Sequence, residues 1–184
     1  KYGIISNKSL FVLLEKGNKD FLKNPEKIVS SIIKRCIMIK VKTVEDDFKE
    51  SNKRVILNFG HTIGHALEKH FSYKKSHGEC IGLGMLIESK ISYSIKKLSK
   101  NDYSRIKNVL DKFNLLNLKI HKTDISKLIR HMKLDKKNKS SKITFALPNK
   151  IGSMSKQKGI YSMEIAERII ISAIKEVLDE FENK

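Results

Sequence analysis

Apolar residues recur at helical spacing over most of the chain. Residues 9–22 repeat them near a period of 3.6, which predicts an amphipathic helix. A second helix is expected from Asn24-Pro25-Glu26 to about Val44, because Asn is a favoured N-cap, Pro fits the first helical position and Glu suits the helix dipole. Residues 81–97 are apolar on most sides, which is typical of a helix buried inside a bundle.

Shorter patterns complete the predicted fold. Ser99 with Asp102 resembles a capping box and opens a helix. Thr123 and Ser162 are the predicted N-caps of a short helix and of a long C-terminal helix. Residues 142–147 alternate like a strand that Pro148 stops. The fold class is therefore all-α, a helical bundle of six to eight helices with at most a small β-hairpin.

Composition narrows the function only slightly. The formal net charge is +18, and 33 of the 38 basic residues are Lys, scattered along the chain with few aromatics between them. This favours solvated lysines over a nucleic-acid interface, and it is compatible with a local pocket for a small anion. Two cysteines without a CxxC pair suit a cytoplasmic location. No apolar run is long enough for a membrane helix, and no signal peptide is visible.

Four of the six histidines lie within 17 residues, at His61, His65, His70 and His77. His61 and His65 are four apart, so on a helix they share one face, and neutral imidazoles are common metal ligands. The motif helix is expected to start near residues 54–58. Gly60 and Gly64 inside it would each cost on the order of 1 kcal/mol relative to Ala, which indicates close approach by another helix or a ligand.

A catalytic zinc ion usually has three protein ligands, and this chain offers two good ones in His61 and His77. His77 is expected at the start of the next helix. Glu68 and Glu79 are candidates for the third ligand, and Glu79 is also a candidate to orient His77 from behind. The remaining histidines are expected on the surface (His70) or in structural or solvated positions (His121, His131).

Several motifs together resemble one family. They are Asn-Phe-Gly-His-Thr-Ile-Gly-His-Ala-Leu-Glu at 58–68, His-Gly-Glu at 77–79, Gly-Leu-Gly-Met at 82–85, Asp-Lys-Lys at 135–137 and the opening Lys1-Tyr2-Gly3. In this order and spacing they are similar to the C-terminal domain of 3-dehydroquinate synthases, within the sugar phosphate cyclase superfamily. The resemblance implies that residues 1–184 form one helical metal- and substrate-binding domain. The chain does not start with Met, and the family's N-terminal dinucleotide-binding domain is expected to be absent from it.

The resemblance implies a metal centre and a cofactor. Zn²⁺, or another divalent metal such as Co²⁺, would be held by His61, His77 and a Glu three residues upstream of Lys1. His65 would then be a catalytic residue that contacts the substrate, not a ligand. NAD⁺ would be bound mainly by the missing N-terminal domain.

Other positions match the family's active site. Lys1 and Glu50 correspond to catalytic residues, Glu50 holding neighbouring cations in place. Lys40, Arg54 and Asn58 correspond to residues that bind the substrate, and one of Lys136 and Lys137 would close on it. Lys40 is expected to follow a buried apolar run at residues 37–39.

The implied reaction converts 3-deoxy-arabino-heptulosonate 7-phosphate to 3-dehydroquinate and phosphate, a lyase step of the shikimate pathway to aromatic amino acids. The implied partner is that small anionic sugar phosphate, with no nucleic acid and no membrane, in a homodimeric full-length enzyme. The isolated chain is expected to be inactive. Three alternatives stay open: another sugar phosphate cyclase, a related metal-dependent polyol dehydrogenase, and a non-catalytic basic helical domain that binds nucleic acid with a steep salt dependence.

Overall fold

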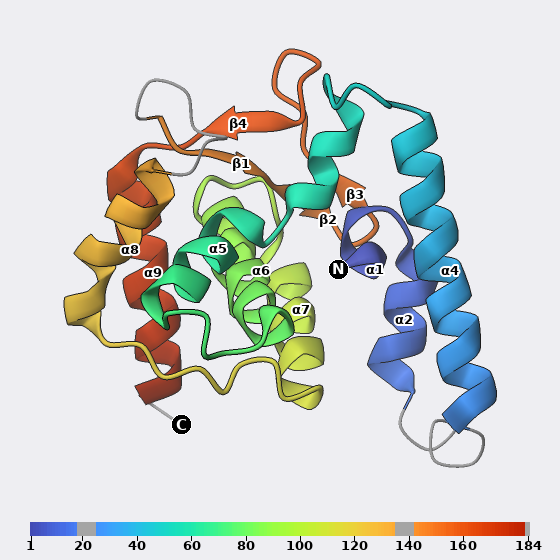
Figure 1. The fold of residues 1–184 in the computed structure, drawn as a ribbon, viewed down its shortest axis with the longest axis horizontal. Coiled ribbons are helices and arrows are strands. Elements are labelled where there is room, and N and C mark those ends of the chain that lie inside the picture. Colours follow the sequence, from blue (N-terminus) through green and yellow to red (C-terminus); the bar gives the residue numbers. More distant parts are fainter. Residues whose placement is uncertain (18–24, 135–141, 183–184) are drawn as a thin grey trace.

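The computed structural model describes residues 1–17, 25–134 and 142–182, and these residues are mainly helical (Figure 1). The elements in chain order are α1 (Tyr2–Ile5), α2 (Lys8–Lys16), α4 (Pro25–Glu45), the 3-10 helix η1 (Lys53–Asn58), α5 (His61–His70), α6 (His77–Ser94), α7 (Lys100–Lys112), the 3-10 helix η2 (Lys122–Asp124), α8 (Ile125–Lys133), β1 (Thr144–Ala146), β2 (Pro148–Lys150), β3 (Ser153–Met154), β4 (Ser162–Glu164) and α9 (Glu167–Glu182). The all-α prediction is confirmed, with two small antiparallel strand pairs.

Helix α6 lies at the centre and is buried from Cys80 to Ser92. Helices α5, α7 and α9 pack around it (Figure 1). This confirms the predicted buried helix, which begins at His77, earlier than its apolar run. Ser76 is its N-cap: the Ser76 hydroxyl accepts from the Glu79 N–H and the Glu79 carboxylate accepts from the Ser76 N–H, which is a capping box. Within the described residues no helix is both long and apolar enough to cross a membrane.

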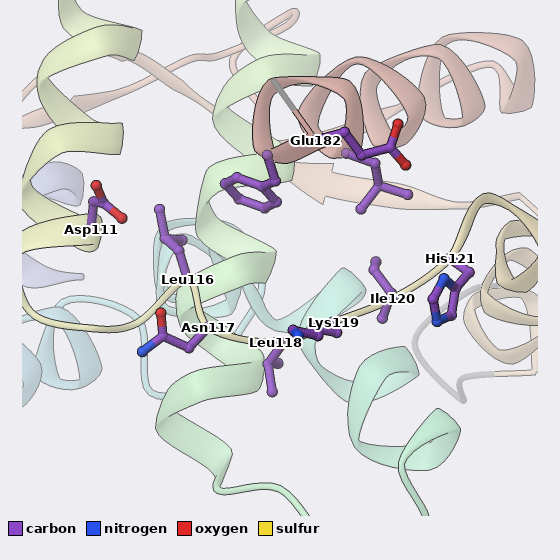
Figure 2. A pocket seen from close by; sticks show the side chains of 10 residues that line it. Asp111, Leu116, Asn117, Leu118, Lys119, Ile120, His121 and Glu182 are labelled. Atoms are coloured by element: carbon purple, nitrogen blue, oxygen red, sulfur yellow. The ribbon is translucent and has the colours of Figure 1, made fainter. Parts of the chain in front are cut away.

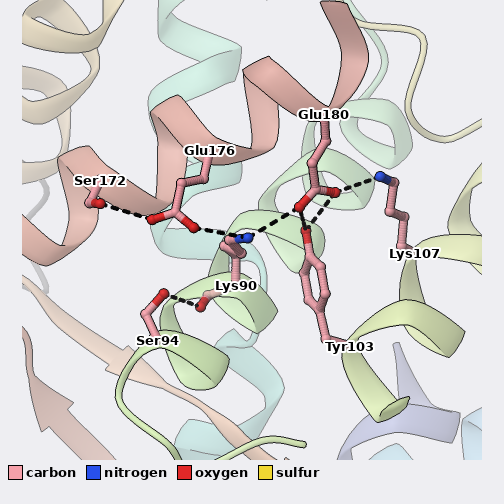
Figure 3. Close-up of polar contacts among 7 residues, drawn as sticks. All are labelled: Lys90, Ser94, Tyr103, Lys107, Ser172, Glu176 and Glu180. Atoms are coloured by element: carbon pink, nitrogen blue, oxygen red, sulfur yellow. Dashed lines mark hydrogen bonds and ion pairs between the residues drawn. The ribbon is translucent and has the colours of Figure 1, made fainter. Parts of the chain in front are cut away.

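An ion-pair network ties α6, α7 and α9 together on the side of α6 that faces α9 (Figure 3). The Lys90 ammonium lies 2.9 Å from Glu176 Oε2 and 3.1 Å from Glu180 Oε1. Glu180 also accepts from the Tyr103 hydroxyl at 3.1 Å and from Lys107. Lys90 is largely buried, so its charge depends on these carboxylates, and the network fixes the register of three helices.

The crossing of α5 and α6 is unusually close because glycines line it. A Cβ added at Gly84 would lie 2.2 Å from the Gly60 carbonyl oxygen and 2.9 Å from the Gly64 nitrogen. Gly64 in turn faces Ile81. Gly60 has φ +83° and is the N-cap of α5, so it precedes the helix. Close approach by a helix therefore explains the glycines.

The long helix α4 stands at the edge of the molecule and packs mainly against η1 (Figure 1). It starts at Pro25 as predicted, while its predicted cap, Asn24, lies outside the described residues. One apolar stripe of this helix is exposed: Val29, Ile33, Ile37 and Val41. The expectation that Lys40 ends a buried helix is therefore wrong, and Lys40 itself is exposed.

The strands revise three local predictions. β1 confirms the strand within residues 142–147, but Pro148 begins β2 instead of ending all strand structure. Ser162 is not a helix cap: it lies in β4, opposite Ala146 of β1, and α9 begins at Glu167. Thr123 lies inside η2, so α8 begins one residue later than a Thr123 cap would place it.

Two helix boundaries also differ from expectation. Helix α2 ends at Lys16 before Gly17, and residues 18–22 of the predicted helix lie outside the described residues. Residues 53–58 are a 3-10 helix, and the motif helix itself starts at His61. The Ser99 cap is confirmed by a 3.0 Å bond from the Asp102 N–H, but the Asp102 carboxylate accepts from the Ile151 N–H instead of closing a capping box.

The close crossing predicts the effect of one methyl group. Gly84→Ala must push α5 away from α6, and we expect it to lower the free energy of unfolding by about 1–3 kcal/mol, as overpacking does. Gly78→Ala is the matched control on the same helix, since no heavy atom lies within 4 Å of its added Cβ. Thermal unfolding followed by circular dichroism checks this. Equal melting temperatures for the two variants would contradict the role given to the crossing.

Candidate metal centre

Three imidazole rings meet where α5 and α6 both begin. The ring centres of His61 and His77 are 5.5 Å apart, those of His61 and His65 5.4 Å, and those of His65 and His77 6.4 Å. His61 and His65 are half-buried, and His77 is exposed. The structure thus brings together the three histidines that the sequence singled out.

Hydrogen bonds fix which ring nitrogen is protonated in two of them. His61 Nδ1 lies 3.0 Å from the Phe59 carbonyl oxygen, and His77 Nδ1 lies 2.8 Å from Glu68 Oε1. A carbonyl or carboxylate oxygen only accepts, so Nδ1 donates in both rings, and in the neutral imidazole this leaves Nε2 with the lone pair. This is the arrangement of a metal-binding histidine, whose second nitrogen is held by an outer partner.

The spacing and charge of His61 also suit a metal. With Zn–N bonds near 2.1 Å and tetrahedral angles, two rings on one ion have centres roughly 5.3 Å apart. The His61–His77 and His61–His65 spacings, 5.5 and 5.4 Å, are both close to this value, so His77 is distinguished by its contact with Glu68 and not by spacing. Burial, and then the charge of Lys1, lowers the pKa of His61 to about 4, so its imidazole is neutral at pH 7. The residues present therefore fit a divalent metal ion.

The two glutamates near the rings have different roles from those expected. Glu68, not Glu79, orients His77, and Glu79 belongs to the capping box of α6. Neither completes a ligand set: the described residues contain no group of three His, Cys, Asp or Glu side chains arranged to hold a metal. Glu68 is excluded as the third ligand more specifically because its carboxylate is engaged behind the His77 ring.

A second group of predicted residues lies on η1 and the turn before it. Asn58 Nδ2 donates to Glu50 Oε1 at 3.1 Å, and Arg54 Nε lies 3.8 Å from Glu50 Oε2. Glu50 therefore holds a cation and an amide together, which is the arrangement expected for it. Glu50 and Asn58 line a cavity of about 330 Å³ with Thr62 and Thr144. Thr62 of this lining directly follows His61 in α5.

The remaining predicted residues are placed as follows. Lys1 Nζ donates to the Leu57 carbonyl at 3.0 Å, beside the start of the motif. Lys40 is exposed on α4. Lys136 and Lys137 lie outside the described residues. His70 is not a surface residue, since its side chain is only 13% exposed and lies 3.7 Å from Asp124.

Sequence reasoning missed two carboxylates that organise the site. Asp47 accepts from the N–H groups of Ser51, Asn52 and Arg54, and these bonds hold the pKa of Asp47 far below its usual range. Glu88 is fully buried and receives N–H groups from the first turn of α5. Burial raises the pKa of Glu88 to about 8, and those N–H bonds oppose the rise. Glu88 could have been noticed in the sequence, because it is an acidic residue inside the apolar run of residues 81–91.

A larger cavity lies elsewhere in the described part of the chain. A cavity of about 600 Å³ lies between the loop of residues 116–121 and the end of α9 (Figure 2). Leu116, Leu118, Leu178 and Phe181 are among its lining residues, together with the exposed His121. It contains no residue of the histidine group. Size therefore does not identify the site, and the chemistry of the side chains does.

Solved structures share this fold. A 2-epi-5-epi-valiolone synthase from Streptomyces hygroscopicus, with NAD⁺ and Zn²⁺ bound, superposes with a TM-score of 0.80 at 16% identity, covering 97% of this chain and 49% of that one. A 2-deoxy-scyllo-inosose synthase complexed with carbaglucose-6-phosphate, NAD⁺ and Co²⁺ gives 0.74 at 23% identity, covering 92% and 50%. The class is thus a helical domain with the fold found in sugar phosphate cyclases.

Sequence comparison is more specific. The family model described as 3-dehydroquinate synthase C-terminal matches residues 1–138, and the chain belongs to this family. Curated 3-dehydroquinate synthases from Thermodesulfovibrio yellowstonii and Acetivibrio thermocellus are 44% and 36% identical, over 84% and 94% of this chain. Those matches cover 43% and 48% of the relatives, so the chain spans about half of their length.

The lowered pKa of His61 predicts a specific acid response of the metal-free chain. The pKa of a His in the unfolded chain is near 6.5. As pH falls from about 6.5 to 4, this histidine is therefore protonated in the unfolded state but remains neutral in the folded state. The stability linked to this residue is present above pH 6.5 and is lost as pH falls through about 4. We expect the melting temperature to fall less over this interval in His61→Gln than in the native chain.

The control for that comparison is His121→Gln, because His121 is exposed and lies outside the three-ring group. Its melting temperature should follow the native curve when both are measured in the presence of a chelator. Native and His61→Gln curves that stay parallel from pH 7 to pH 4 would contradict the buried, neutral state of His61.

Proposed function

We propose that this chain is the metal- and substrate-binding half of a 3-dehydroquinate synthase. The reaction converts 3-deoxy-arabino-heptulosonate 7-phosphate to 3-dehydroquinate and phosphate. Membership of the family and the curated names of its relatives support this reaction. The observation that carries the proposal is the pairing of His61 and His77, each with Nδ1 held from behind and their rings spaced for one ion.

On this proposal His61 and His77 are two of three metal ligands, and the third is a Glu that precedes Lys1 in the full-length protein. The absence of a three-residue ligand group among the described residues is compatible with a centre completed from outside them. Zn²⁺ or Co²⁺, the metals carried by the structural neighbours, would act as a Lewis acid on a substrate oxygen. NAD⁺ would serve as a hydride acceptor that returns its hydride, so the overall reaction is redox-neutral.

The other residues of the site would bind and orient the substrate. Arg54 offers a planar guanidinium that suits a carboxylate or phosphate, and Glu50 fixes it beside Asn58. His65 lies in the three-ring group beside His61 and His77, and we assign it to proton transfer or to stabilising a substrate oxygen, together with Lys1. Lys40 and one of Lys136 and Lys137 would contribute further positive charge to substrate binding, from outside the group of Glu50, Arg54 and Asn58.

The alternatives differ in what they explain. Another sugar phosphate cyclase shares the fold, but the curated relatives at 34–44% identity are 3-dehydroquinate synthases. A polyol dehydrogenase does not explain the Glu50–Arg54–Asn58 group. A nucleic-acid-binding domain does not explain the ring pair, and lysines such as Lys90, Lys107 and Lys122 are engaged with carboxylates.

The decisive experiment uses a two-half enzyme, in which this chain follows the amino-terminal half of the Thermodesulfovibrio yellowstonii relative. We expect phosphate release from the heptulosonate phosphate and about one zinc ion per chain. His61→Ala and His77→Ala should lose the zinc and the turnover, because each removes a ligand. His65→Ala should keep the zinc and lower kcat by roughly 10²–10⁴-fold.

His121→Ala is the matched control and should keep both zinc and turnover. Full zinc occupancy in the His77→Ala enzyme, measured by elemental analysis, would show the ligand assignment to be wrong. Turnover only of a sugar phosphate without a carboxylate would favour another cyclase. Salt-sensitive binding of duplex DNA by a protein without turnover would favour the nucleic-acid alternative.

A further inference from the structure

Glu88 carries a carboxyl group in the centre of the bundle that none of the proposed chemical steps uses. It lies on α6, is fully buried, and points at the beginning of α5. Its Oε2 accepts from the Gly60 N–H at 2.6 Å, and its Oε1 accepts from the Ile63 N–H at 3.3 Å. The Thr62 N–H is a third donor to it. Burying a carboxyl group costs free energy unless its oxygens are hydrogen-bonded. The position of Glu88 and its three N–H donors therefore needs an explanation.

The explanation begins with a helix that lacks a side-chain cap of its own. The N-cap of α5 is Gly60, which has no side chain, so the first N–H groups of the helix need another acceptor. A Ser or Asp at that position is excluded, because φ is +83° and a Cβ would lie 2.5 Å from Met85 Cγ. The other central helices, α6 and α7, use local serine caps, Ser76 and Ser99. Glu88 supplies from α6 the cap that Gly60 cannot.

The three donors surround His61, the first residue of α5. The Gly60 N–H precedes it and the Thr62 and Ile63 N–H groups follow it, so the carboxylate fixes the backbone on both sides of this histidine. Glu88 is part of the same helix that begins with His77. One rigid helix therefore carries one candidate ligand at its start and clamps the backbone of the other.

We propose that Glu88 is a positioning residue of the metal centre, which holds His61 at the correct distance and angle from His77. This inference rests on the proposed function, since it presumes that these two histidines share an ion. The carboxylate touches neither the metal nor the substrate. It acts through the backbone of α5, so its effect must be visible in metal binding itself and not only in turnover.

The test measures metal affinity and geometry in the two-half enzyme. The Zn²⁺ dissociation constant is obtained by competition with a chelator, and the visible spectrum of the Co²⁺ form reports ligand geometry. We expect Glu88→Ala to weaken Zn²⁺ binding about 10–100-fold and to alter the Co²⁺ spectrum. Glu88→Gln keeps an acceptor oxygen of the same shape and should restore part of the affinity.

Ser89→Ala is the matched control, because Ser89 is buried on the same helix and its hydroxyl bonds only within it, to the Met85 carbonyl. It should leave affinity and spectrum unchanged. Glu88 variants that melt at lower temperature but bind Zn²⁺ as the parent does would overturn the inference and leave the proposed function standing. If Glu88→Ala does not fold, Glu88→Gln decides by the same criterion. A parent enzyme that binds no metal would overturn the proposed function itself.

Discussion

The close crossing of α5 and α6 is the constraint on which the site depends. Gly84 of α6 lies against the Gly60 carbonyl and the Gly64 nitrogen of α5, a separation that leaves no room for a Cβ. Because one candidate ligand begins each of these helices, the distance between the helices sets the distance between the rings. Close packing, the buried Glu88 bonds and the ring spacing are therefore consequences of one geometric requirement. The Lys90 network holds the same helix against α7 and α9 (Figure 3).

Local signals predicted the elements where nothing competed with them. The apolar run of α6, Pro25 at the start of α4 and the Ser99 cap were read correctly because each depends on a few neighbouring residues. Ser162 was misread because its partner, Ala146, is distant in sequence, and strand pairing there outweighs the preference of serine for helix caps. The start of α5 was placed too early because the apolar pattern continues through η1, and the two helices are separated by the non-helical backbone of Phe59 and the positive φ of Gly60.

The site was predictable only in part from the residues themselves. The histidine spacing located it, but spacing alone placed His65 beside His61 as a candidate ligand, and the family resemblance was needed to assign His65 to the substrate. The residues already offered His77 as a ligand beside His61, and the structure adds a physical reason, the contact between His77 and Glu68, which lie nine residues apart across a turn. Glu88 and Asp47 were missed because their partners are backbone N–H groups, which leave no trace in the pattern of side chains.

The two halves of the proposed site are built with different rigidity. The metal side rests on α5 and α6, whose backbones touch through glycines and share buried hydrogen bonds. The anion-binding side rests on the short helix η1, on a turn held by Asp47, and on Lys40 of the sparsely packed helix α4. On the proposed function, the ion would be held in a preformed geometry, while the groups that bind the charged ends of the substrate sit on elements that can adjust. This difference in rigidity suits a reaction in which one bound molecule changes shape through several steps. The metal ion would stay fixed while the groups that bind the charged ends move with the substrate.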